Sequence, residues 1–241
     1  MMDIRIAITG GTSGLGLALV REWTKRGARV AFVARERKRV ERVARQNEGA
    51  FGIVGDVSRK EDIHPIALQI AGALGGLDVL VNNASDLGPV PLALLNDTEC
   101  EELERAIATN VMGPFRLTRA LMGSLAASAR VGRGAVVLNI SSDAAINPYP
   151  RWGAYGASKA ALHHMSRIWN EEMGEAGVHF LSLDPGDMDT PMHALALPDA
   201  DRATLKRPED AAREMADAIE AALPRQELRA QVGVALLRGI A

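Results

Sequence analysis

The sequence contains a single cysteine, Cys100, among its 241 residues. One cysteine excludes an intrachain disulfide and a metal site built from several thiolates. The five histidines show no metal-binding spacing, and the adjacent pair His163 and His164 points in different directions on a helix. Asp187 and Asp189 lie in a predicted loop without further ligands, so we expect them to be solvated. We therefore expect no metal.

A charge excess of either sign is also missing. The chain has 28 Lys and Arg against 30 Asp and Glu, which gives a net charge of −2. This balance argues against nucleic acid or an anionic membrane as a partner. The amino terminus has no signal-peptide pattern, and no apolar run is long enough to span a bilayer. With 47% hydrophobic residues, the composition indicates a reduced, cytoplasmic, globular protein with small-molecule partners.

Short runs rich in valine, isoleucine and leucine alternate with amphipathic segments of helix length. The runs predict strands over residues 4–9, 29–34, 51–55, 78–82, 134–141 and 178–183. Runs of this kind are typical of strands buried on both faces, so the alternation predicts a parallel sheet with helices on both sides. No proline- or serine-rich linker divides the chain, and we expect one domain over residues 1–241. Residues 88–99 and the region after Pro185 are predicted loops, whereas residues 229–241 fit a strand or a helix.

The glycine-rich stretch TGGTSGLG follows the first predicted strand and opens the first predicted helix. Gly10, Gly14 and Gly16 allow a tight turn and a close backbone approach, and the helix amino terminus offers N–H groups to a pyrophosphate. The spacing is G-x-x-x-G-x-G rather than G-x-G-x-x-G, and no Gly-Lys-Ser/Thr follows, which argues against a phosphate-transferring P-loop. A turn without a ligand is the alternative, but the strand before it and the helix after it favour a dinucleotide.

The strand predicted over residues 29–34 ends where the adenosine ribose of a dinucleotide is expected. Arg35 follows it, at a place where NAD-binding proteins commonly have an acid that bonds the ribose 2′-hydroxyl. An arginine can bind a 2′-phosphate, and Arg37 and Lys38 add positive charge nearby. We therefore expect NADP(H) to be preferred over NAD(H), although Glu36 could turn inward and weaken the preference.

The chain has only two tyrosines, and one of them, Tyr155, lies one helical turn before Lys159. The two side chains share a helix face. A free tyrosine has a pKa of about 10, and a lysine in a partly desolvated site can lower it toward neutrality. Tyr155 could then give a proton to a carbonyl oxygen or take one from an alcohol. Taken alone, the pair fits two ordinary surface residues as well.

Several motifs in order resemble the short-chain dehydrogenase/reductase family over roughly residues 4–190. They are TGGTSGLG at 9–16, GDV at 55–57, NNAS at 82–85, TNVMGPF at 109–115, NISS at 139–142, YGASK at 155–159 and PGDMDT at 185–190. Tyr155 follows Ser142 by thirteen positions, a spacing common in this family. The spacing favours Ser142 over Ser141 as the catalytic serine.

The resemblance implies a Rossmann fold: a doubly wound parallel α/β sheet in a three-layer α/β/α sandwich. It implies that Tyr155 is the acid and base, that Ser142 orients the reacting oxygen, and that Lys159 also holds the nicotinamide ribose. It implies that Asn110 keeps a water near Lys159. The residues implied to contact NADP or NAD are Gly10, Thr12, Ser13, Gly14, Leu15, Gly16, Arg35, Asp56, Val57, Asn83, Ala84, Tyr155, Lys159, Pro185, Gly186, Met188 and Thr190.

Two features depart from the family pattern. Ser85 stands where the family has glycine and could crowd the cofactor crevice. The carboxyl terminus lacks the V-D-G-G ending that many members use in tetramer contacts, so we expect a homodimer or homotetramer without choosing between them.

The leading functional prediction is reduction of a small carbonyl compound or oxidation of a secondary alcohol. A non-catalytic dinucleotide sensor is the competing function, although such a protein is expected to lose Tyr155 or Lys159. A cofactor-using epimerase or dehydratase is a third possibility, but those relatives tend to be longer. Residues 187–206 are predicted to form a mobile lid over the substrate, with a short helix near residues 193–197 between Pro191 and Pro198.

Overall fold

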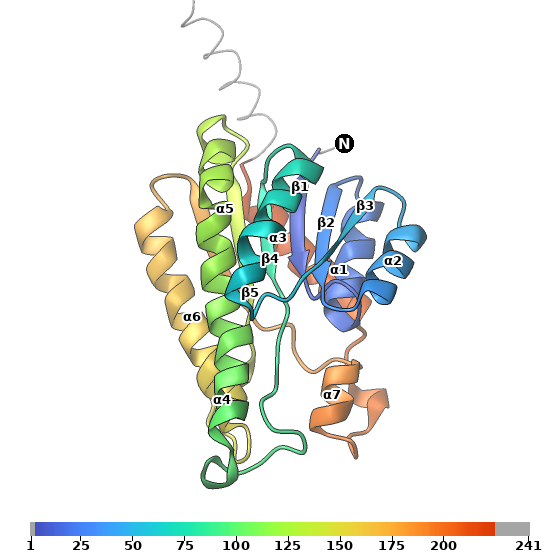
Figure 1. The fold of residues 1–241 in the computed structure, drawn as a ribbon, viewed down its shortest axis with the longest axis vertical. Helices are drawn as coiled ribbons and strands as arrows, with labels where there is room; N and C mark the ends of the chain where they lie inside the picture. The colour runs from blue at the N-terminus through green and yellow to red at the C-terminus, as the bar shows by residue number, and fades with distance from the viewer. Residues whose placement is uncertain (1–2, 225–241) are drawn as a thin grey trace, which may run out of the picture.

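The centre of the computed structural model, which describes residues 3–224, is a sheet of parallel strands (Figure 1). The strands are β1 (Arg5–Thr9), β2 (Arg29–Ala34), β3 (Ala50–Val54), β4 (Val79–Asn82), β5 (Ala135–Ile140) and β6 (Val178–Leu183). Among the described residues their order is β3-β2-β1-β4-β5-β6, with every neighbouring pair parallel. The order reverses between β1 and β4, and a reversal of this kind opens a crevice at the carboxyl ends of the strands.

Helices cover both faces of this sheet (Figure 1). The helices are α1 (Gly14–Lys25), α2 (Arg37–Gln46), α3 (Lys60–Leu74), α4 (Cys100–Ile107), α5 (Gly113–Arg130), α6 (Gly153–Met173), α7 (Pro191–Ala196) and α8 (Pro208–Ala222). Side chains of α1, α2 and α8 form the core on one face, and those of α3, α5 and α6 form it on the other. The arrangement is the doubly wound, three-layer Rossmann architecture.

The strands lie close to where the apolar runs predict them. β2 and β6 coincide with the predicted ranges, and the other four differ by one residue at one or both ends. The expectation of burial on both faces is wrong for β3, where Phe51 is 45% exposed, because this strand pairs only with β2 among the described strands. The undecided segment 229–241 lies outside the described residues.

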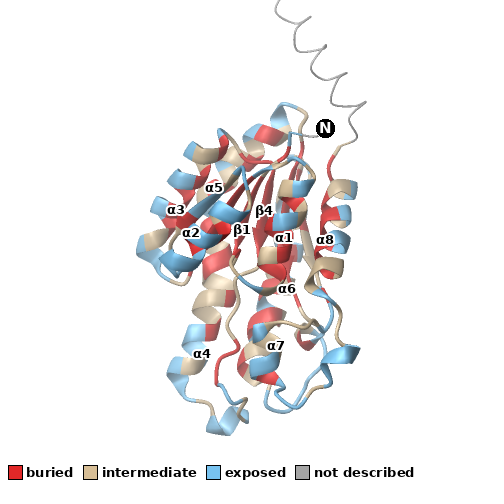
Figure 2. Ribbon diagram, turned by 90° about the vertical axis from the view of Figure 1, so that its right-hand side faces the viewer, coloured by how far each residue is buried: buried red, intermediate tan, exposed pale blue. Residues whose placement is uncertain are grey.

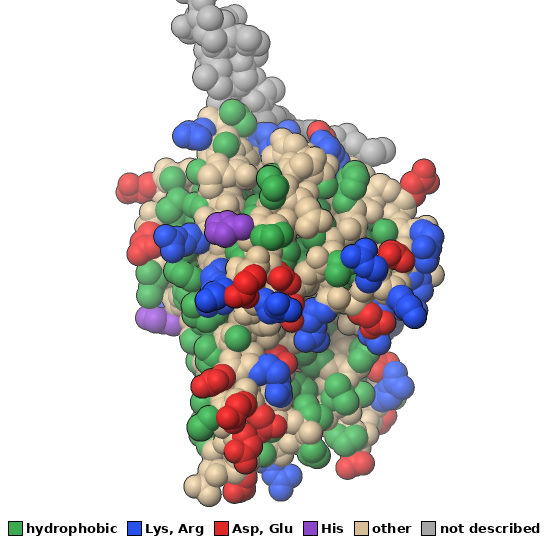
Figure 3. Space-filling view, viewed as in Figure 1, with side chains coloured by type: hydrophobic (Ala, Val, Ile, Leu, Met, Phe, Trp, Pro, Cys, Tyr) green, Lys and Arg blue, Asp and Glu red, His purple; other side chains and the backbone are tan. Residues whose placement is uncertain are grey.

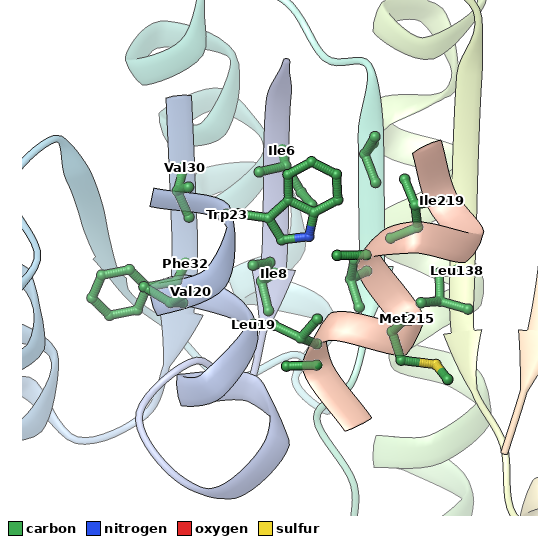
Figure 4. Close-up of a cluster of buried hydrophobic side chains, with 14 of the residues drawn as sticks. Ile6, Ile8, Leu19, Val20, Trp23, Val30, Phe32, Leu138, Met215 and Ile219 are labelled. Carbon is green, nitrogen blue, oxygen red and sulfur yellow. The ribbon is translucent and has the colours of Figure 1, made fainter. Parts of the chain in front are cut away.

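Burial is concentrated on the strands and on the helix faces that meet them (Figure 2). Trp23 of α1 is fully buried and packs with residues of β1 and α8, including Ile6 and Ile219 (Figure 4). Its indole N–H has no hydrogen-bond partner within the described part of the chain, so the ring contributes through its apolar area. Burying a large side chain of this kind stabilises by roughly 2–3 kcal/mol. The contact fixes α1, and with it the glycine-rich turn, against β1.

A row of hydrogen-bonded amides and hydroxyls runs across β4 and β5 on the face of the sheet that α5 and α6 cover. Asn82 and Asn139 lie opposite each other in β4 and β5, and the Asn82 amide donates to Asn139 Oδ1 at 2.8 Å. The same amide nitrogen donates to Thr118 Oγ1 on α5 at 3.2 Å, and Asn139 Nδ2 donates to Ser166 Oγ on α6 at 2.8 Å. Because buried polar groups must keep their partners, this row restricts how α6 can sit on the sheet.

Asp78, just before β4, joins several segments at the end of the sheet that lies away from the crevice. Its buried carboxylate accepts from Arg5 Nη2 at 2.7 Å and from Arg133 Nη2 at 2.8 Å, and also from the Ser128 hydroxyl. Burial alone would raise the pKa of Asp78, but the hydrogen bonds from Arg133, Arg5 and Ser128 outweigh it and hold this pKa well below its usual range. The carboxylate thus joins β1 and the end of α5 to the start of β4.

We expect Asp78→Asn to lower the free energy of unfolding by about 3 kcal/mol at neutral pH, because it leaves two half-buried arginines without their buried anion. The folded-state pKa of Asp78 is depressed, so its contribution is present above the ordinary carboxyl pKa of about 4 and decreases as the pH falls below it. Urea unfolding between neutral pH and about pH 3 should show the wild-type advantage shrinking.

Asp97→Asn is the matched control, since Asp97 is exposed and makes no ion pair with a described residue. It should change the unfolding free energy little at any pH. An Asp78→Asn penalty that stays constant with pH would contradict the role assigned to the charge.

Candidate active site

A cavity of about 710 Å³ opens at the carboxyl ends of the strands, where the strand order reverses. It reaches from the end of β2, past the start of α1, to α6 and α7. It is lined by every site residue predicted from the sequence except Asn110. The fold therefore brings the predicted motifs together around one crevice.

The glycine-rich turn forms one wall of this cavity. Gly10 has a φ of 71°, and a Cβ placed on Gly16 would lie 2.2 Å from the Gly10 carbonyl oxygen, so a side chain at position 16 would break the turn. Ser13, the N-cap of α1, makes no side-chain capping bond. The first N–H groups of α1 thus border the cavity without a side-chain partner, and helix termini of this kind bind phosphate groups. The turn fits a dinucleotide pyrophosphate.

Thr9, at the end of β1, joins this turn to the segment after β4. Its hydroxyl accepts from the backbone N–H of Asn83 at 2.9 Å and of Ala84 at 3.0 Å. The Asn83 side chain donates back to the Thr9 carbonyl at 2.8 Å. These bonds close the floor of the crevice between β1 and β4. Sequence reasoning did not identify Thr9, because its role depends on two strands that are far apart in the chain.

At the other end of the cavity, beyond β2, the lining side chains are charged. Arg35, Glu36 and Arg39 are exposed and border the cavity, whereas Arg37 and Lys38 do not. Glu36 is paired with Arg39 at 2.7 Å, so its charge is balanced and Arg35 remains as the excess cation. Arg39 was missed by sequence reasoning, although its place in the first turn of the helix that follows Arg35 was a usable signal.

Asp56, after β3, is held by its neighbour. Its Oδ1 accepts from the Ser58 N–H at 2.9 Å and from the Ser58 hydroxyl at 2.7 Å. The second oxygen has no hydrogen bond to another described residue, and Asp56 lines the cavity. Its free oxygen is suited to accept a hydrogen bond from an adenine amino group.

The catalytic residues predicted on α6 meet the end of β5. Lys159 is buried, and its Nζ donates to the carbonyl oxygen of Ile140, the last residue of β5, at 2.7 Å. The same ammonium lies 5.5 Å from the centre of the Tyr155 ring. The hydroxyl of Ser142 lies close enough to that of Tyr155 to favour ionisation of the phenol, and it donates to Asp143 Oδ1 at 3.2 Å. Ser141, in contrast, is buried at the sheet end, where its N–H donates to Leu183.

Burial controls the acidity of both groups on α6. Together with the nearby carboxylates of Asp184 and Asp143, it raises the pKa of Tyr155 to about 12, although the hydroxyls of Ser142 and Ser85 act in the opposite direction. Burial also lowers the pKa of Lys159 to about 8, although the Asp184 charge acts in the opposite direction. In the free protein, Lys159 therefore does not bring the pKa of Tyr155 below its ordinary value, and the further lowering expected from an oxidised nicotinamide stays a prediction. The ammonium is bonded to a carbonyl and lies over the ring instead of at the hydroxyl.

Asn110 lies behind this site, in a π-helical segment from Ala108 to Met112. Its Nδ2 donates to the Asp86 carbonyl and to the Ser158 hydroxyl, both at 2.8 Å. Its Oδ1 accepts from the Asp86 N–H at 2.8 Å and from the Ser85 hydroxyl at 3.2 Å. All hydrogen-bonding positions of the side chain are used within the protein, and the water that the family resemblance implies at Asn110 stays a prediction. The side chain fixes the segment after β4 to α6.

The sequence led us to expect that Ser85 could crowd the crevice. In the structure, its side chain also makes specific contacts. Its hydroxyl donates to Asn110 and also lies within hydrogen-bonding reach of Tyr155, where it favours ionisation of the phenol. A glycine at this position would supply neither contact.

The predicted lid contains the helix α7, which begins at Pro191 and ends at Ala196. Pro191 therefore starts the helix instead of interrupting it, since proline is well suited to the first helical position. The Thr190 hydroxyl caps the helix by accepting from the His193 N–H at 3.2 Å. The helix starts two residues earlier than predicted.

The base of this segment is closed by its own hydrogen bonds. Lys206 donates from its N–H to the Asp187 carbonyl at 2.9 Å and accepts from the Asp189 N–H at 3.0 Å. Arg202 adds an ion pair with Asp189 at 2.7 Å. The segment from 187 to 206 thus has more internal structure than a loop that orders only against a ligand, and its closure on a substrate stays a prediction.

None of the helices within residues 3–224 combines the length and apolar character that crossing a membrane requires. The same residues contain no group of three or more His, Cys, Asp or Glu side chains placed to hold a metal ion.

Comparison with known proteins gives concordant matches. The family model for short chain dehydrogenases matches residues 5–201. The 2-(R)-hydroxypropyl-CoM dehydrogenase of Xanthobacter autotrophicus is 31% identical over 194 residues, which cover 78% of this chain and 76% of that protein. The solved 3-ketoacyl-(acyl-carrier-protein) reductase of Brucella melitensis, complexed with NADH, has a TM-score of 0.83 at 27% identity and covers 93% of this chain and 91% of its own. The alcohol dehydrogenase of the archaeon Thermococcus sibiricus, complexed with 5-hydroxy-NADP, has a TM-score of 0.80 at 26% identity, with 90% and 91% covered.

The acidity of Tyr155 can be measured directly, because Tyr149 is the only other tyrosine. In a Tyr149→Phe background, phenolate absorbance reports Tyr155 alone. We expect no phenolate up to about pH 10, the ordinary tyrosine pKa, since burial raises the pKa of Tyr155 to about 12. Saturation with the oxidised dinucleotide should lower the pKa of Tyr155, because a positive ring near the phenol favours its ionised form. Ionisation near neutral pH in the free protein would show that Lys159 outweighs burial.

Proposed function

The chain belongs to the short-chain dehydrogenase family, and on this basis we propose that it transfers a hydride between NADP(H) and a carbonyl compound or secondary alcohol. The observation that supports this most is the meeting of three groups at one wall of the cavity. Tyr155, the hydroxyl of Ser142 and the buried ammonium of Lys159 lie together, and the glycine-rich turn lines the same cavity.

The residues present fit a dinucleotide. The turn at Gly10–Gly16 would hold the pyrophosphate, Asp56 the adenine, and Lys159 the nicotinamide ribose. Pro185, Gly186, Met188 and Thr190 line the cavity beside the catalytic groups and would surround the nicotinamide. When bound, the cofactor supplies or accepts the hydride.

Tyr155 acts as the general acid in reduction. Its raised pKa keeps the phenol protonated at neutral pH, so it holds the proton that a reduced carbonyl oxygen needs. Ser142 hydrogen-bonds the same oxygen and orients it. Lys159, whose pKa is about 8, can exchange protons near neutrality, and its positive charge favours the phenolate that remains after the transfer.

The competing function is a non-catalytic dinucleotide sensor. Lowering the pKa of Lys159 from 10.5 to about 8 corresponds to a cost of about 3 kcal/mol for keeping an ammonium buried at neutral pH. A protein that only binds a dinucleotide could use Lys159 to hold the nicotinamide ribose, but it has no need to bury that ammonium 5.5 Å from the centre of a tyrosine ring. The buried charge beside Tyr155 therefore favours catalysis.

The preference for NADP(H) rests on the charged end of the cavity. Arg35 is the excess cation there, and Arg39 lies beside it. The solved relatives are complexed with NADH in one case and with 5-hydroxy-NADP in another, so they support a nicotinamide dinucleotide of either kind. As the sequence led us to expect, we propose a small-molecule substrate and a homodimer or homotetramer.

Tyr155→Phe should reduce kcat by about 100-fold or more, since general acid catalysis typically contributes 10²–10⁴-fold. Cofactor binding, measured by fluorescence titration of NADPH, should be nearly unchanged because only a hydroxyl is removed. A variant that keeps more than about a tenth of the wild-type rate would show that another group supplies the proton.

Arg35→Ala should weaken NADP(H) binding at least about tenfold and NAD(H) binding little, because a charged hydrogen bond to a phosphate is lost. Arg39→Ala should give a smaller change in the same direction. Arg37→Ala is the matched control, since Arg37 begins α2 two residues after Arg35 but lies outside the cavity. Equal losses for both cofactors in Arg35→Ala would remove the basis for the preference.

A further inference from the structure

Arg151 has a backbone conformation unlike that of its neighbours. Its φ is 72°, and it is the one non-glycine residue with a positive φ among residues 3–224. This left-handed conformation is unfavourable for a residue with a Cβ, whereas glycine adopts it without strain. Strained residues of this kind cluster at ligand-binding sites. The conformation alone could be supplied better by glycine, so the arginine side chain is the feature to explain.

Arg151 lines a groove that continues the active-site cavity. The groove has a volume of about 590 Å³ and shares Trp152, Ala196 and Leu197 with the catalytic cavity. Its other walls include Pro91 and Leu92 on one side and Pro198 on the other. Trp152 stands at the junction, with its ring 5.6 Å from that of Tyr155.

The groove is open to solvent at an apolar rim. Leu197, which lines the groove, is 42% exposed, and Leu195 of α7 and Val90, which are next in sequence to lining residues, are 58% and 48% exposed. Figure 3 shows hydrophobic side chains at the surface beside α7, at the lower right. An extended apolar group could therefore run from the catalytic cavity into the groove and contact the walls of both.

The groove carries one cation and one carboxylate, whereas three carboxylates and the Lys159 ammonium border the catalytic end. The catalytic end is bordered by the carboxylates of Asp143, Asp184 and Asp187, which would repel an anionic group placed close to the reacting carbon. In the groove the charged side chains are Arg151 and Asp199, and neither makes an ion pair with a described residue. The Arg151 guanidinium is therefore available, and its planar fork suits a carboxylate or another oxyanion.

From these observations we propose that the substrate is an apolar carbonyl compound or secondary alcohol that ends in an anionic group, and that Arg151 binds this group in the groove beyond Trp152. This inference rests on the proposed function, since it assigns the substrate of the same site. The reacting carbon lies at Tyr155, the apolar spacer lies between Pro91 and Leu197, and the anion is held away from the carboxylates of the catalytic end.

The test uses methyl-ketone carboxylates of increasing chain length, each paired with its methyl ester, and measures kcat/KM with NADPH and with NADH. For chains long enough to reach the groove, the wild type should prefer the acid over the ester by about tenfold or more, mainly through KM. The preference should be absent for the shortest acids, whose charge would face the acidic catalytic end.

Arg151→Gly removes the guanidinium and relieves the strained conformation, so the variant should fold, and its ratio of acid to ester should fall to about one. Arg151→Lys keeps the charge without the fork and should keep part of the preference. Asp199→Asn removes the opposite charge from the same groove and should not reduce the preference. Arg37→Ala, outside both cavities, should leave the ratio unchanged.

Equal rates for acids and esters in the wild type would overturn the substrate assignment, while continued consumption of reduced cofactor would leave the proposed function standing. A preference that survives Arg151→Gly would also overturn it. If no compound is turned over, binding of the long acids is measured by calorimetry. Binding that is lost in Arg151→Gly would then support the groove and contradict the proposed reaction, whereas no binding would contradict both.

Discussion

The hydrogen bond from Lys159 to the carbonyl of Ile140 is the contact on which the rest of the site depends. It is 2.7 Å long and buried, and it joins α6 to the last residue of β5. Ser142 follows Ile140 by two positions, and Tyr155 precedes Lys159 by one helical turn. This one bond therefore sets the distance between Ser142, after β5, and Tyr155, on α6. Because an ammonium buried with a single carbonyl partner is unfavourable, the surrounding fold has to hold it there. The buried row through Asn139 and Ser166 supplies part of that restraint.

The same burial explains why Tyr155 keeps its proton at neutral pH in the free protein. Desolvation disfavours the charged form of each group, so it raises the pKa of Tyr155 to about 12 and lowers that of Lys159 to about 8. Asp184 acts in the same direction on both, by raising each pKa, and it therefore favours the protonated phenol and the charged lysine together. Positive charge that arrives with an oxidised nicotinamide would shift the balance toward the phenolate. Under the proposed function, the charge of the bound nicotinamide would therefore affect whether Tyr155 holds its proton.

Much of this fold could be predicted from the sequence, because strands buried on both faces leave continuous apolar runs. The site residues were identified by motif order, and all but Asn110 line the cavity. What could not be predicted depended on contacts between distant segments. The saturation of Asn110 requires the segment after β4 and α6 to meet it at once, and no local pattern encodes that meeting. The exposure of β3 depends on its place at the edge of the described sheet, and the pKa of Tyr155 depends on how far the assembled site excludes water. Arg151 gave no signal, since its conformation and its groove come from loops.

The charges around the cavities form a consistent pattern when they are taken together. Cations stand at two ends, with Arg35 beyond β2 and Arg151 in the groove, while the carboxylates of Asp143, Asp184 and Asp187 border the middle. A dinucleotide brings phosphates to the first end and, when oxidised, a positive ring to the middle, so its own charges complement those of the protein. A substrate in the remaining space must place a neutral reacting group in the middle, because an anion there would face three carboxylates. Under the proposed substrate assignment, an anionic group would lie at Arg151, in the groove that also contains the exposed Asp199. This order of charges would orient the substrate, since the carboxylates beside Tyr155 would repel an anionic end.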